Sequence, residues 1–197
     1  MISKKAILWM ALATIVVFGG LGVFLVPLTR DVNILLFLQG TKPLYIQLFI
    51  GAAIGIITAM AGWQIVELPF MHSTKVFFVN IIKPLRLSFI EIFFISICAG
   101  VGEELFFRGA MQPYLGVWIT SFLFVLFHGY INPFNLPLTV YGIYMVFVIG
   151  VLGLFTEFLG IGTAMVAHTL IDVILIFRLS KVEIPKNDAE IHEDSVN

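Results

Sequence analysis

Long apolar runs, separated by short polar stretches, dominate the pattern of the chain. A helix needs about 20 apolar residues to cross about 30 Å of hydrocarbon, and an unclosed chain can cross lipid only as helices. Six apolar runs predict membrane spans, over residues 6–28, 44–66, 88–110, 115–130, 137–157 and 161–179. Pro27 and the polar residues after it are expected to end the first span. The sequence therefore predicts an all-α, polytopic membrane helical bundle of about six transmembrane helices.

Two stretches between the first three spans have a different pattern. The apolar piece at residues 32–38 is too short to cross a bilayer. In residues 67–87, basic residues such as Lys75 and Lys83 alternate with phenylalanines and isoleucines. This mixture predicts an amphipathic segment that lies in the membrane interface. Within the second span, the spacing of Gly51 and Gly55 predicts close packing against another helix.

The chain divides into two parts by composition. Residues 1–179 form the predicted membrane-embedded domain, whose first apolar run is longer than the core of a signal peptide and is expected to be retained. From residue 180 the chain is polar and mainly acidic, so residues 180–197 are expected to be a disordered tail. With six spans, most basic residues fall on one side, which predicts a multi-pass protein of the cell membrane with both termini in the cytoplasm.

Composition excludes two broad classes of protein. Apolar residues make up 60% of the chain, charged residues 12%, and the mean hydropathy is +1.06, which excludes an ordinary soluble domain. The net charge is −1 and the basic residues are scattered, so no nucleic-acid partner is expected. The single cysteine, Cys98, lies in an apolar run and is interpreted as a packing residue.

Polar residues inside the apolar runs carry the chemical information. A charged residue at mid-membrane costs about 2.5 to 3.5 kcal/mol, so such residues usually pair or serve a function. The residues concerned are Glu91, Glu103, Glu104, Arg108, His128, Glu157, His168 and Asp172. Glu91 and Glu157 lie near span ends and are interpreted as interfacial residues without a role, and His72 and His192 as solvated.

Helical spacing groups these residues further. Positions four apart share a helix face, so Glu104 and Arg108 can form an ion pair, and His168 and Asp172 project in one direction. Glu103 lies on a neighbouring strip of its helix. His128 adds an imidazole from another span, one turn after Phe124. The groups could face one interior cavity as a catalytic constellation; an ion-pair cluster, a packing histidine and an interhelical hydrogen bond remain the structural alternatives.

Three short motifs carry a resemblance to a known family. The stretches "EELFFR", "FVLFH" and "HTLID" resemble, in this order, the EExxxR, FxxxH and HxxxN/D motifs of the CAAX-protease and bacteriocin-processing (CPBP) family. That family includes the Ras-converting CAAX endopeptidases, and the resemblance covers about residues 88–178. Many members have asparagine where this chain has Asp172. An ionised aspartate only accepts hydrogen bonds, so Asp172 either is protonated to donate or orients His168.

The resemblance implies an intramembrane endopeptidase, which cuts a peptide or a membrane-anchored precursor in peptide maturation or in self-immunity to bacteriocins. The compact chain suggests a bacterial origin. It implies that Glu103 and His128 activate water, while His168 and Asp172 stabilise the oxyanion. It leaves Glu104, Arg108 and Phe124 in supporting positions, and Arg108 could alternatively bind a substrate carboxylate.

Alternatives remain for both the chemistry and the function. Glu103, His128 and His168 could instead be zinc ligands, but the HExxH signature is absent, so a glutamate peptidase without a cofactor is favoured. The alternative function is a non-proteolytic membrane scaffold or regulator of a partner such as a sensor kinase. A small proton-coupled transporter is a third possibility, which the lack of an evident inverted repeat disfavours.

Overall fold

The computed structural model describes residues 3–183, and within this range the chain contains helices and no strand. The predicted all-α bundle is confirmed. The helices, in chain order, are α1 (Lys4–Thr14), η1 (Ile15–Gly19), α2 (Gly20–Arg30), α3 (Ile34–Gln39), α4 (Leu44–Val66), η2 (Pro69–Met71), α5 (His72–Ile82), η3 (Lys83–Leu85), α6 (Phe89–Glu104), η4 (Leu105–Met111), α7 (Gln112–Phe127), α8 (Leu136–Phe158) and α9 (Ile161–Lys181).

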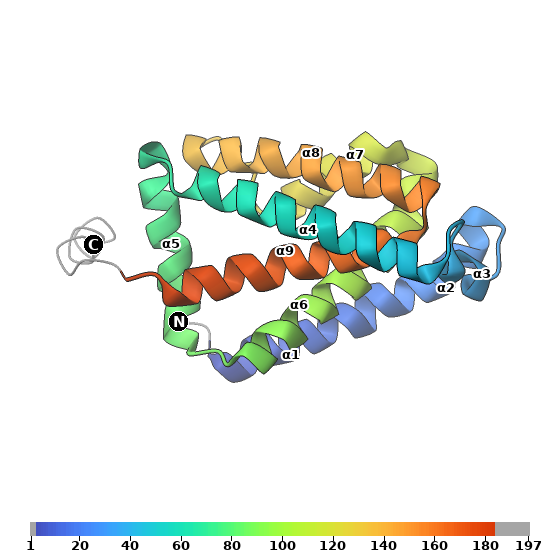
Figure 1. Cartoon of the computed structure of the whole chain (residues 1–197), viewed down its shortest axis with the longest axis horizontal. Helices are drawn as coiled ribbons and strands as arrows, with labels where there is room; N and C mark the ends of the chain where they lie inside the picture. Colours follow the sequence, from blue (N-terminus) through green and yellow to red (C-terminus); the bar gives the residue numbers. More distant parts are fainter. Residues whose placement is uncertain (1–2, 184–197) are drawn as a thin grey trace.

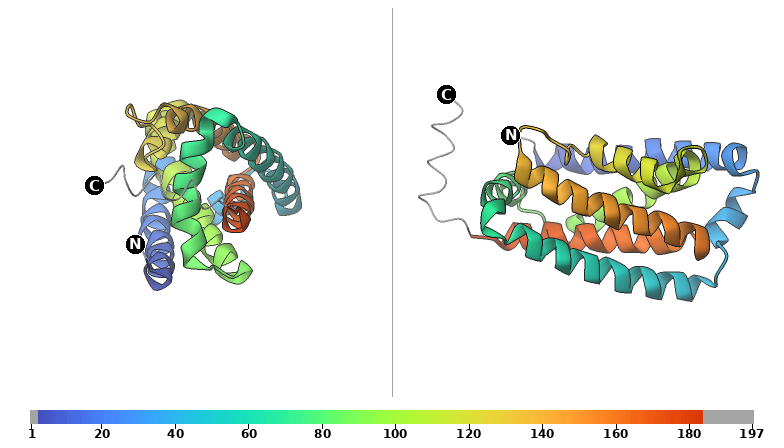
Figure 2. Two further views of the ribbon diagram at one scale, coloured as in Figure 1. Left: turned by 90° about the vertical axis from the view of Figure 1, so that its left-hand side faces the viewer. Right: turned by 90° about the horizontal axis from the view of Figure 1, so that it is seen from above.

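The long helices run side by side, and α5 crosses one end of the bundle (Figure 1). The start of α1 and the end of α9 lie at this α5 end, while α3 and the α8–α9 turn lie at the opposite end (Figures 1 and 2). The predicted tail falls almost entirely outside the described residues. The exceptions include Ser180 and Lys181, which are helical because α9 continues to Lys181.

Within residues 3–183, four helical segments have the length and apolar composition to cross a membrane: Lys4–Arg30, Leu44–Val66, Leu136–Phe158 and Ile161–Lys181. A fifth results if the bent pair Pro69–Leu85 and Phe89–Phe127, at 117° to each other, counts as one span. The described part of the chain is therefore a multi-pass bundle with four to five such helices, where about six were predicted.

The number of spanning helices is lower because the predicted third and fourth spans are joined. No loop separates them, because the π-helical turn η4 joins α6 to α7 and the Gln112 N–H donates to the Phe107 carbonyl. The chain bends instead at Gly116, inside α7, where φ is 73° and glycine has no side chain to oppose it.

The first span also differs from its prediction. Pro27 lies inside α2 and does not end it, and the helix continues to Arg30. Proline is tolerated within membrane helices because neighbouring groups satisfy the backbone positions that it leaves unpaired. This continuation carries Arg30 to the opposite end of the bundle from Lys4 (Figure 1).

The amphipathic segment predicted over residues 67–87 consists of η2, α5 and η3. Thr74, Val76 and Val79 are buried against the bundle, whereas Phe77 and Ile81 are exposed. This two-sided character follows from the helical spacing of the apolar residues.

The predicted glycine contact is confirmed between α4 and α9. A Cβ atom at Gly51 would lie 2.6 Å from the Thr163 carbonyl oxygen, and one at Gly55 would lie 2.7 Å from that of Ala167. The contact therefore presses α4 against the stretch of α9 that carries His168.

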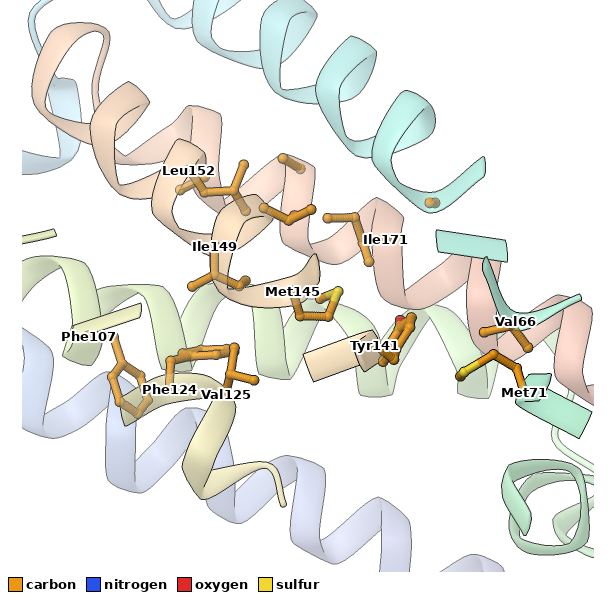
Figure 3. Packing of buried hydrophobic residues seen from close by; sticks show 14 residues of the cluster. Val66, Met71, Phe107, Phe124, Val125, Tyr141, Met145, Ile149, Leu152 and Ile171 are labelled. Atoms are coloured by element: carbon orange, nitrogen blue, oxygen red, sulfur yellow. The ribbon is translucent and has the colours of Figure 1, made fainter. Parts of the chain in front are cut away.

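Buried apolar residues of α4, η2, η4, α7, α8 and α9 form the main core (Figure 3). Phe107 and Phe124 pack edge to face, with ring centroids 4.8 Å apart. Ile149, Leu152 and Ile171 are almost completely buried beside them. The core fixes the relative positions of the helices that carry the polar residues.

Candidate active site

All the site residues predicted from the three motifs meet inside the bundle. Glu103 and Glu104 end α6, and Arg108 lies in the π-helical turn η4. Phe124 is in α7, His128 directly follows that helix, and His168 and Asp172 are in α9.

Glu104 forms the fully enclosed part of the site. Its Oε2 accepts from Arg108 Nε at 3.1 Å, and its Oε1 accepts from His168 Nδ1 at 2.9 Å. The side chains of Glu104 and Arg108 have no exposed surface. The predicted ion pair is therefore present. The sequence did not reveal that Glu104 also binds His168, which joins the first motif to the third.

Glu103 faces the other histidine. His128 Nδ1 lies 2.7 Å from the Phe124 carbonyl oxygen, which can only accept, so Nδ1 carries the hydrogen. This leaves Nε2 toward Glu103, 3.3 Å from Oε2. Glu103 Oε2 is buried and has no aligned hydrogen bond to any described residue. The carboxylate is thus close to an imidazole but retains an oxygen for a further partner.

One ring nitrogen of His168, Nδ1, is hydrogen-bonded to Glu104, and the other, Nε2, has no such bond among the described residues. Because Nδ1 donates to Glu104, only Nε2 is left on the side of Asp172, 3.6 Å from Oδ2. That distance is too long for a hydrogen bond. Since Nδ1 already carries a hydrogen, Nε2 can donate to another group only when the ring is an imidazolium.

Phe124 contacts both imidazoles. Its ring stacks on His128 with centroids 4.4 Å apart and meets His168 edge to face at 5.6 Å. The phenyl ring is 3% exposed. Phe124 thus fixes the spacing of two histidines that come from different helices.

A cavity of about 320 Å³ adjoins these groups. His128, His168 and Asp172 supply its charged and polar lining, and most other lining side chains are apolar. The cavity extends past Tyr141 to Ile81 and Leu179, so it leads toward the α5 end of the bundle.

Tyr130 lines the same cavity, in the loop between α7 and α8. Burial, followed by the nearby carboxylates of Asp172 and Glu103, raises the pKa of the Tyr130 hydroxyl. The phenol therefore remains a hydrogen-bond donor at neutral pH.

Two sequence-based interpretations need correction. Arg108 cannot bind a substrate carboxylate, because its guanidinium is fully enclosed and donates to Glu104, Gln112 and Ser121. Glu157 lies near the end of α8, as interpreted, but it is not without a role, because Arg30 and Gln112 both bind its carboxylate.

Other polar residues differ less from expectation. Glu91 pairs with Lys4 at 2.9 Å and caps the start of α6. Cys98 is buried, as predicted, and His72 is exposed. His192 lies outside the described residues.

The proposed zinc ligands do not form a metal site in this geometry. Within residues 3–183, no three side chains of His, Cys, Asp or Glu are placed to hold one ion. The set Glu103, His128 and His168 therefore does not fit a zinc ion as placed, and no chemical step is assigned to one.

Gln112 was missed in the sequence. It is 3% exposed, accepts from Arg108 Nη1 at 3.0 Å and donates to Glu157 Oε1 at 2.6 Å. The signal was available, because Glu104, Arg108 and Gln112 follow one another at intervals of four. The π-helical turn between them could not be foreseen from that spacing.

Comparison with known families agrees with this arrangement. Residues 85–174 match the family model described as "Type II CAAX prenyl endopeptidase Rce1-like". This match supports membership of the CPBP family. The matched region contains every residue of the three motifs and indicates a peptidase, while α1 to α4 lie outside it. Curated proteins and solved structures gave no match.

Proposed function

We propose that the protein is an intramembrane endopeptidase that hydrolyses a peptide bond in a peptide or a membrane-anchored precursor. The observation that carries the proposal is that His128, His168 and Asp172 line one apolar cavity, with the two glutamates directly behind the histidines. Glu103 faces His128, and His168 lies between Glu104 and Asp172.

Glu103 is the general base in this proposal. Its buried Oε2 takes a proton from a water molecule as the water oxygen attacks the scissile carbonyl carbon. His128 Nε2 lies 3.3 Å from Glu103 Oε2, close enough to contact the same water molecule and orient it. The hydrogen bond from His128 Nδ1 to the Phe124 carbonyl holds the ring for this role.

His168 stabilises the oxyanion that forms. As an imidazolium, held by Glu104 through Nδ1, it donates from Nε2 to the developing negative charge. When the carbonyl re-forms and the C–N bond breaks, the proton held by Glu103 passes to the leaving amine nitrogen. Asp172 lies close enough to favour the charged ring by its own charge.

The cavity suggests how a substrate reaches these groups. Its apolar lining suits an apolar or lipid-modified segment, and it leads to the α5 end. Lys4, Lys75, Lys83 and Arg86 belong to the segments at this end. By the positive-inside rule we place this end in the cytoplasm, with both termini. A bacterial precursor in peptide maturation or bacteriocin self-immunity is the substrate class we favour.

The substitution Glu103→Gln tests the function. It keeps the shape of the side chain and removes the base, so cleavage is expected to fall at least about a hundredfold. Precursor peptides are compared by mass spectrometry between cells that carry wild-type protein and the variant. Thermal unfolding in detergent should remain close to wild type, because Glu103 has no aligned hydrogen bond to lose among the described residues. A variant with full activity and phenotype would instead favour a scaffold.

A further inference from the structure

We propose that Arg30 and Gln112 are positioning residues for His168. They act through a continuous chain of hydrogen bonds that starts in the N-terminal span, outside the matched region. In this way a helix that carries none of the three motifs takes part in the catalytic arrangement. The expected effect on cleavage rests on the proposed peptidase function, whereas the hydrogen-bond geometry does not.

The chain of hydrogen bonds begins with a bidentate ion pair. Arg30 Nη1 and Nη2 donate to the two carboxylate oxygens of Glu157 at 3.2 and 2.8 Å. Glu157 Oε1 also accepts from Gln112 Nε2 at 2.6 Å. Since Arg30 is in α2 and Glu157 in α8, the pair links the N-terminal span to the motif-bearing region at the end opposite α5 (Figure 1).

Gln112 connects this ion pair to Arg108 in the interior of the bundle. Its Nε2 also donates to the Gly153 carbonyl at 3.1 Å, which determines the orientation of the amide. The amide oxygen therefore faces Arg108 and accepts from Nη1 at 3.0 Å. Arg108 in turn donates to Glu104, and Glu104 accepts from His168. Each link joins a donor to an acceptor, so a displaced Gln112 moves the groups that hold the imidazole.

Arg30 has a second function in the same place. Pro113 has no N–H, so it cannot donate to the Gly109 carbonyl at i−4 or to the Arg108 carbonyl at i−5. Arg30 Nε donates to Gly109 at 3.1 Å, and Nη2 donates to Arg108 at 2.6 Å. The Thr29 hydroxyl also donates to the Gly109 carbonyl, at 3.3 Å. Arg30 thus binds both carbonyls that proline leaves without a donor and, together with Thr29, holds the π-helical turn that carries Arg108.

Gly153 provides the space that the chain of hydrogen bonds needs. A Cβ atom there would lie 2.6 Å from Gln112 Oε1 and 3.0 Å from Arg108 Nη1. Alanine at this position would therefore displace one or both side chains, although it favours a helix more than glycine does. This steric limit gives an independent way to disturb the chain.

The first test is Gln112→Glu in the full-length protein. Glutamate is nearly the same size and can accept from Arg108, but an ionised carboxylate cannot donate to Glu157 or Gly153. We expect kcat for precursor cleavage to fall about tenfold, as a misplaced catalytic group does, with KM within about twofold. Arg30→Gln is expected to act in the same direction, and Arg30→Lys to recover part of the loss.

Lys4→Gln is the matched control. It breaks the Lys4–Glu91 ion pair, which also ties the N-terminal span to the matched region, but at the α5 end. Cleavage by this variant is expected to equal that of wild type. An equal loss in Lys4→Gln would mean that Arg30 acts only by anchoring the span, and this would overturn the proposal.

A second readout does not depend on cleavage. The side-chain ¹⁵N resonances of His168, measured in detergent micelles, report its hydrogen-bond partner. They should shift in Gln112→Glu and Gly153→Ala and remain in place in Lys4→Gln. Unchanged resonances and unchanged kcat in folded variants would overturn the proposal.

If wild-type protein cleaves no precursor, the peptidase function fails while the resonances still decide the positioning role. If Gln112→Glu does not fold, the same resonance and kcat measurements on Gly153→Ala test the positioning role.

Discussion

Glu103 and Glu104 are adjacent in the chain, yet their surroundings differ in almost every respect. Both oxygens of Glu104 are bound, one by Arg108 and one by His168, and its side chain has no exposed surface. Glu103 is 13% exposed, and its Oε2 has no aligned hydrogen bond within residues 3–183. One glutamate is fixed by its partners, and the other has an oxygen without an aligned hydrogen bond to a described residue, as the proposed general base requires.

The difference shows how a helix can place two identical side chains in different roles. Successive residues diverge by about 100° around a helix, so Glu104 points toward η4 and α9 while Glu103 points toward the end of α7. The π-helical turn brings Arg108 against Glu104. The comparison can be tested by giving each glutamate the same substitution.

Glu104→Gln is expected to have the largest combined effect. The amide cannot accept two hydrogen bonds at the positions of both oxygens, and the buried guanidinium loses its counter-charge. Breaking a buried ion pair costs about 3 to 5 kcal/mol, so thermal unfolding should occur at a clearly lower temperature and cleavage should be lost with it. Glu103→Gln should lose cleavage alone. Equal stability in the two variants would contradict the distinction.

Asp172→Asn is expected to have a smaller effect. Asp172 makes no hydrogen bond to His168 at 3.6 Å, so the substitution removes a charge near the imidazole but no close contact. Cleavage should fall by no more than about tenfold, since the loss is that of one partly exposed charge. Steady-state kinetics on one precursor peptide measure it. A loss as large as that of Glu103→Gln would give Asp172 a direct part in the chemistry.

Chelation is expected to have the smallest effect. No three metal-binding side chains among the described residues are placed to hold one ion, so we predict full cleavage in strong chelator and no stoichiometric zinc in the purified protein. Elemental analysis and an activity assay after dialysis provide the measurement. Bound zinc whose removal stops cleavage would reassign Glu103, His128 and His168 as ligands.

Much of the fold could be predicted because lipid allows few solutions. The spans over residues 44–66, 137–157 and 161–179 agree closely with α4, α8 and α9. The stretch from Phe89 to Phe127 was harder to predict from the sequence. Apolar length alone does not distinguish a loop from a π-helical turn that keeps its hydrogen bonds. Pro27 was misleading for a related reason, since proline ends helices less strictly in membranes than in water.

The sequence alone determined an apolar bundle, three motifs, and the pairing of Glu104 with Arg108, since helical periodicity and the cost of charge in lipid act through local spacing. Tertiary structure decided the partners across helices. It brought Glu104 to His168, Glu103 to His128, and Arg30 to Glu157. These contacts depend on the π-helical turn before Gln112 and on the bend at Gly116. Such features arise from contacts between distant residues, which no local pattern in the chain records.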